Sequence, residues 1–68
     1  MNYIIIEMQT SNGATAVVTP IYVNSDRTES EAVFLEKCAA ARRSKLAVHT
    51  VILLDNEGKQ IAKKTFKA

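Results

Sequence analysis

The sequence contains one histidine, His49, and one cysteine, Cys38, so the side chains best suited to nucleophilic or metal chemistry occur once each. His49 falls within a run of alternating apolar residues, with no serine, cysteine or carboxylate motif beside it. Cys38 falls on the apolar face of an expected helix, where a thiol packs as a small hydrophobic group. It is also far from the helix start, where the helix dipole would lower its pKa. We therefore predict no catalytic residues and no enzyme activity.

Neither a cofactor nor a metal is expected. A structural zinc site needs a cluster of cysteines and histidines, and this chain has one of each. The segment Asp55-Asn56-Glu57-Gly58 offers oxygen atoms but lacks the long alternating ligand series of a calcium loop. The two glycines, Gly13 and Gly58, each belong to an expected turn, which leaves no glycine-rich loop to hold a phosphate.

The charges are unevenly distributed along the chain. Up to Leu35 there are four acids and one base, a net charge of −3, and from Glu36 onward there are eight bases and three acids, a net charge of +5. Such a basic half can bind nucleic acid, although it is more often a solvated surface. The residues that would contact nucleic acid are Arg42, Arg43, Lys45, Lys59, Lys63, Lys64 and Lys67.

The elements that must position these residues follow from periodicity and turn signals. Alternating and β-branched residues predict strands over 3–10, 15–23, 46–55 and 59–66. Asn12-Gly13 predicts a tight turn between the first two strands, and Gly58 closes a second turn. A helix is expected to begin near Asp26 or Thr28 and to end near Ser44. Because proline has no N–H group, Pro20 predicts either a bulge in the second strand or a longer loop.

The order of elements is ββαββ, which predicts an α+β fold: a four-stranded, mainly antiparallel sheet with one helix packed on one face. We expect residues 1–68 to form a single domain. One helix covers only one face of a sheet, and both faces here carry apolar residues. If Ile4, Ile6, Val48 and Ile52 meet the helix, the other face becomes an interface formed by Ile5, Val18, Tyr22, Val51 and Leu53. Alternatively, the last strand or the Lys63 side chain partly covers that face.

Chain length adds a second reason to expect association. A domain of 68 residues buries only about 60% of its unfolded surface and has no disulfide to support it. We therefore predict a homo-oligomer, most simply a dimer, with a different protein partner as the alternative.

The longest apolar run, 51–54, is too short to cross a membrane, so no membrane association is expected. The lack of a signal-peptide pattern and the lone thiol favour the cytoplasm.

Three stretches carry a resemblance to a known group of proteins: 3–7 (YIIIE), 38–41 (CAAA) and, most strongly, 48–58 (VHTVILLDNEG). With these motifs the chain resembles short uncharacterised proteins of Gram-positive bacteria and their prophage or phage-like regions. The resemblance implies a phage-associated setting and a small α+β fold, and it brings no functional residues. The lysine-rich C-terminal segment departs from the group. The expected function is therefore non-enzymatic self-association or protein interaction through the open sheet face, with nucleic-acid binding as the alternative.

Overall fold

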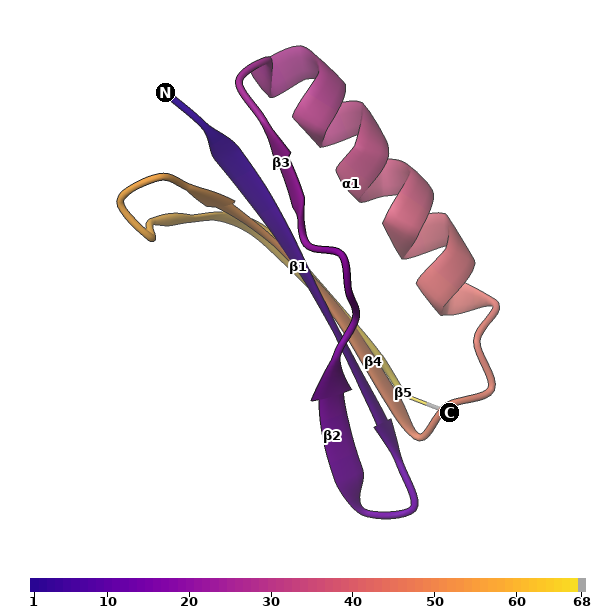
Figure 1. Ribbon diagram of the computed structural model, residues 1–68. Coiled ribbons are helices and arrows are strands. Elements are labelled where there is room, and N and C mark those ends of the chain that lie inside the picture. The colour runs from indigo at the N-terminus through magenta and orange to yellow at the C-terminus, as the bar shows by residue number, and fades with distance from the viewer. Residues whose placement is uncertain (68) are drawn as a thin grey trace.

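The protein is built from one antiparallel sheet and one helix, as the computed structural model shows for residues 1–67 (Figure 1). The elements are β1 (Tyr3–Ser11), β2 (Ala14–Val17), β3 (Tyr22–Asn24), α1 (Arg27–Arg42), β4 (Val48–Asp55) and β5 (Gln60–Lys67). The strand order is β2-β1-β4-β5, and β3 also pairs with β1. The predicted α+β fold is confirmed. The sheet has five strands instead of four because the second predicted strand is divided into β2 and β3.

The first hairpin turns at Asn12-Gly13, as the sequence predicts. Both residues have positive φ angles, 53° and 79°, which the short loop between β1 and β2 requires. Met8 therefore lies opposite Val17 in the predicted register.

The register changes between β2 and β3. Ile4 lies opposite Val23, two residues beyond the Ile21 that an uninterrupted strand would have placed there. Pro20 lies in the interruption, where its missing N–H costs no ladder hydrogen bond. The two-residue loop at Asn12-Gly13 excludes the longer-loop alternative, and the strand is interrupted near Pro20. A shift of two residues preserves the alternation of side chains between the two faces.

Asp26 is the residue that caps α1. Its Oδ1 atom accepts a hydrogen bond from the backbone N–H of Glu29 at 3.1 Å. The buried residues of the helix are Ser30, Phe34, Cys38 and Ala41, spaced by three or four positions. Leu35 lies outside this stripe and is 65% exposed.

The second hairpin connects β4 to β5 through a three-residue loop. Asp55 Oδ1 accepts hydrogen bonds from the backbone N–H groups of Glu57 and Lys59, both at 2.9 Å. Gly58 has a φ of 83°, the left-handed conformation that closes this turn. The turn places Gln60 opposite Leu54, and a register shift between Leu53 and Leu54 then places Ala62 opposite Leu53.

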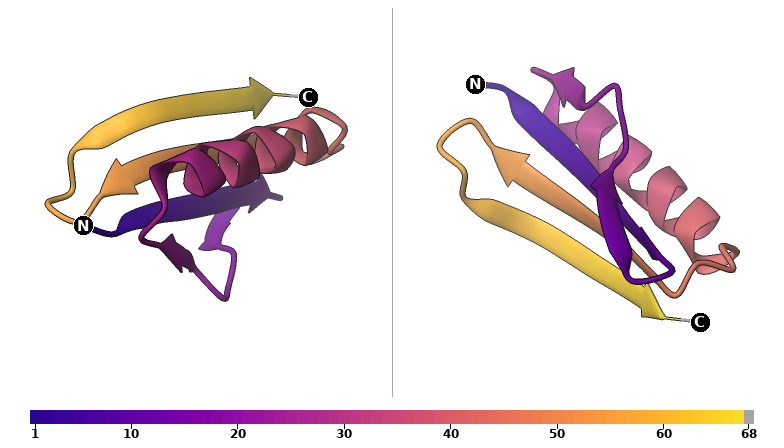
Figure 2. Two further views of the ribbon diagram at one scale, coloured as in Figure 1. Left: turned by 90° about the horizontal axis from the view of Figure 1, so that it is seen from above. Right: turned by 60° about the horizontal axis from the view of Figure 1, so that its bottom comes forward.

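The helix covers the face of the sheet that the sequence analysis assigned to the interface. Ile5, Val51 and Leu53 are 2%, 0% and 0% exposed and form the core with Phe34 and Cys38. The assignment of these three residues to an open face is therefore wrong. The left view of Figure 2 shows α1 lying over β4 and β1, with β5 beside it, and the right view shows the uncovered face.

The other two residues of the predicted interface are not on the open face either. Tyr22 lies opposite Ile5 and packs against the core from β3. Val18 is half-buried just after β2, where its N–H donates to the Glu7 carbonyl at 2.8 Å.

The last strand explains why the helix covers this face. On the covered face β5 places Ala62, Phe66 and the exposed Lys64, which lie opposite Leu53, His49 and Val51. On the other face it places Lys63, Thr65 and Lys67, none of which is apolar. Apolar side chains gain free energy when packing removes them from water. The two apolar side chains of β5 therefore favour the face that the helix covers.

We expect Leu53→Ala to lower the free energy of unfolding by about 2–5 kcal/mol, because it removes a fully buried side chain. Val23→Ala, at a site 56% exposed, should change it by less than about 0.5 kcal/mol. Urea denaturation followed by circular dichroism measures both. Equal losses for the two variants would contradict this assignment of faces.

Candidate functional site

The face of the sheet opposite α1 carries a continuous apolar surface, here called the open face. Cross-strand partners share a face, so the registers define its members. Its apolar members are Ile4, Ile6 and Met8 of β1, Val17 of β2, Val23 of β3, and Val48, Ile52 and Leu54 of β4. Val17 and Val23 are 46% and 56% exposed, and the other six are half-buried. An uncovered apolar surface of this kind typically marks an interface.

Threonine hydroxyls at the far end of this face form hydrogen bonds with one another. Thr10 Oγ1 lies 2.8 Å from Thr15 Oγ1, and Thr50 Oγ1 donates to Thr65 Oγ1 at 3.3 Å. These pairs lie across neighbouring strands on the same face as Met8. Because each hydroxyl already has a partner, covering this end of the sheet would leave no unsatisfied polar group there.

The charged side chains on the open face are lysines at one edge. Lys63 lies opposite Ile52, and Lys67 lies opposite Val48. Both belong to β5, the last strand of the sheet, and both are exposed. Long lysine side chains at the rim of an interface can keep their ammonium groups in water.

The predicted open apolar face is therefore present, but its residues are the ones expected beneath the helix. Ile4, Ile6 and Ile52 are the central examples. The turn at Gly58 alone would not have identified them, because it pairs Leu54 with Gln60 and, continued along the strands, would place Ala62 beside Ile52. A register shift between Leu53 and Leu54 places Lys63 beside Ile52 instead.

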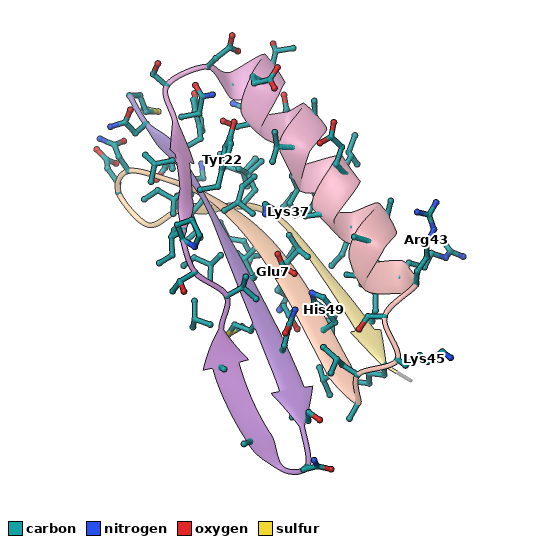
Figure 3. The ribbon with its side chains drawn as sticks, turned by 45° about the vertical axis from the view of Figure 1, so that its right-hand side comes forward. Glu7, Tyr22, Lys37, Arg43, Lys45 and His49 are labelled. Carbon is teal, nitrogen blue, oxygen red and sulfur yellow. The ribbon has the colours of Figure 1, made fainter. Side chains whose placement is uncertain are left out.

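On the covered face, the fold brings together Glu7 of β1, Lys37 of α1 and His49 of β4 (Figure 3). His49 Nε2 lies 2.6 Å from Glu7 Oε2, and Lys37 Nζ lies 3.6 Å from Glu7 Oε1. A carboxylate only accepts hydrogen bonds, so Nε2–H is the donor. His49 Nδ1 is buried and has no hydrogen-bond partner among residues 1–67.

His49 has no carboxylate motif beside it in the sequence, and the antiparallel pairing of β1 and β4 is what gives it a carboxylate partner. Gln9 lies opposite His49, which places Glu7 diagonally across from the ring. The imidazole is 6% exposed beneath α1, so a substrate would reach it only if the helix and sheet separated. The pair therefore acts as a polar contact between layers.

The seven basic residues do not form one surface, although all of them are exposed. Lys63 and Lys67 belong to the open face, whereas Lys64 shares the opposite side with Phe66. Lys59 follows the β4–β5 turn. Figure 3 shows Arg43 and Lys45 at the C-terminal end of α1, directed outward. The remaining base, Arg42, lines a groove beside β5.

A groove of about 350 Å³ runs between the second half of α1 and β5. Its lining includes Phe34, Leu35 and Cys38 on the helix side and Phe66 on the strand side. Arg42 and Lys64 contribute the positive charges of this groove, one from each wall. Burial raises the pKa of the Cys38 thiol above its ordinary value of 9.0, and the positive charge of Lys64 opposes that rise.

Comparison of the chain with protein-family models, curated proteins and solved structures found no match. None of the helical structure in residues 1–67 has the length and apolar character needed to cross a membrane. Within the described part of the chain, no three His, Cys, Asp or Glu side chains are grouped so that they could hold a metal ion.

We expect Glu7→Leu to lower the free energy of unfolding by about 1–3 kcal/mol, because the buried imidazole loses its partner. The double variant Glu7→Leu/His49→Leu should lose less than the sum of the two single variants, because it leaves neither group unpaired. Chemical denaturation of all four proteins gives the coupling energy. Additive losses would mean that the two side chains do not interact.

We expect Lys64→Gln to slow alkylation of Cys38 by iodoacetamide at a pH just below 9.0. Removing the positive charge raises the pKa of the thiol further, so a smaller fraction is present as thiolate. Lys63→Gln is the matched control because Lys63 projects from the other face of the same strand. If both variants react at the same rate, Lys64 does not act on the thiol.

Proposed function

We propose that the protein is a non-catalytic accessory protein that self-associates through the open face. The observation that carries this proposal is the apolar surface formed by Ile4, Ile6, Val23, Ile52 and Leu54 on the side of the sheet that α1 leaves uncovered. Removing such a surface from water is favourable in proportion to its apolar area. A second copy of the chain supplies a surface of the same character.

The size of the open face fits a dimer interface. The two longest extents of the molecule, 36 Å and 19 Å, set an upper limit of about 680 Å² on the projected area of this face. A standard interface buries about 800 Å² on each partner. A two-fold axis through this face would bring each apolar patch against its own copy. Lys63 and Lys67, both at the β5 edge, would then lie near the rim of the interface.

Association would also stabilise the fold. A chain of this length buries too little surface to be more than marginally stable alone. Binding between folded copies adds to the stability of the folded state by mass action.

The covered face supports a non-catalytic role, because both oxygens of Glu7 are engaged and His49 lies beneath α1.

The setting of this function is proposed from the sequence. The resemblance to short proteins of Gram-positive bacteria and their prophages favours a phage-associated accessory role. The single thiol, Cys38, suits a reducing compartment, so we place the protein in the cytoplasm.

We expect the mass measured by light scattering to rise from monomer to dimer as the protein concentration increases. Ile6→Lys should weaken association by about tenfold or more, because it places a charge at the centre of the open face. Leu35→Lys is the matched control: it makes the same type of change at a 65% exposed site on α1. Circular dichroism confirms that both variants fold.

A protein that remains monomeric up to millimolar concentration would contradict the proposal. Equal weakening by Ile6→Lys and Leu35→Lys would also contradict it, because the association would then use a surface other than the open face.

A further inference from the structure

The groove between α1 and β5 lies on the opposite side of the sheet from the open face, and it has features of its own. Phe34 and Leu35 of the helix and Phe66 of the strand give it apolar walls. Leu35 is 65% exposed, which is unusual for a large apolar side chain on a helix that is already packed. The apolar side chains of these walls would be removed from water if a second chain segment lay between them.

The edge of the sheet beside this groove is unpaired. β5 pairs with β4 on one side only and ends the strand order. Its eight residues form a long edge, and alternate backbone N–H and C=O groups of an edge strand point away from the sheet. Such an edge can accept an extended peptide as an additional strand.

The charges around this edge select the kind of peptide. Among residues 1–67 the ion pairs are Arg27–Glu31, Lys37–Glu7 and His49–Glu7, so Arg42 and Lys64 have no carboxylate partner there. Lysines project from both faces of β5: Lys64 on the groove side, and Lys63 and Lys67 on the other. Pairing of β5 with β5 of a second copy would bring these like charges together, which is unfavourable.

We propose that the groove between α1 and β5 binds an extended acidic peptide segment that adds to the free edge of β5. Apolar side chains of the peptide pack between Phe34, Leu35 and Phe66, and its carboxylates are neutralised by Arg42 and Lys64. Backbone hydrogen bonds to β5 supply affinity independent of peptide sequence, and the groove supplies the preference for acidic and apolar residues. This site is separate from the surface used for self-association.

The test uses a short peptide of alternating glutamate and valine with blocked ends, titrated into the full chain and followed by calorimetry. Saturable one-to-one binding per chain is expected. The same peptide with lysine in place of glutamate should not bind. Arg42→Glu/Lys64→Glu should weaken binding of the acidic peptide by about tenfold or more, because both positive charges of the groove are reversed.

Arg43→Glu/Lys45→Glu is the matched control, because it makes the same change in net charge just outside the groove. It should weaken binding by less than about threefold. Equal weakening by the two double variants, or no binding by the unaltered chain at millimolar peptide, would overturn the proposal. Tighter binding of a single-stranded oligonucleotide, lost equally in both variants, would instead assign these bases to nucleic acid.

Two further measurements locate the peptide. Cys38 lies in the groove and is the only thiol in the chain, so the bound peptide should slow its alkylation. Peptides methylated at alternate backbone nitrogens should bind more weakly if the peptide adds to β5, and unchanged affinity would exclude strand addition. Ile6→Lys on the open face should leave peptide affinity unchanged, which separates this site from the self-association surface.

Discussion

The structure depends on one constraint: a single helix has to cover one face of a sheet that is apolar on both. Sixteen residues of α1 lie above β4 and β1, where Ile5, Val51 and Leu53 are almost completely buried. All other surface properties follow from this packing. The opposite face is left uncovered, and β5 lies beside the helix instead of beneath it, which forms the groove.

The two faces differ in how their polar groups are satisfied. On the covered face, the Glu7 carboxylate contacts both the His49 ring and the Lys37 ammonium group, so these three side chains form one polar cluster between the layers. On the open face, threonine hydroxyls pair with each other. The first arrangement holds the helix to the sheet. The threonine pairs leave a surface that another copy of the chain can cover without leaving these hydroxyl groups unpaired.

The two proposed surfaces make different demands on the same strand. β5 contributes Lys63 and Lys67 to the rim of the open face and Lys64 and Phe66 to the groove. Its lysines discourage pairing between copies at the edge, a common device against uncontrolled sheet extension. They also make that edge attractive to an acidic strand. Self-association through the flat face and peptide binding at the edge are therefore compatible.

Local signals in the sequence were sufficient for the helix, the three long strands and both turns, but not for the division of the second predicted strand into β2 and β3. The left-handed conformations at Asn12-Gly13 and Gly58 and the cap at Asp26 each depend on a few neighbouring residues. The face covered by the helix was not a local property. It was decided by tertiary packing, because alternation in β1 and β4 offers two similar apolar sides and only the β5 register distinguishes them. The pairing of Glu7 with His49, 42 residues apart, arose in the same way.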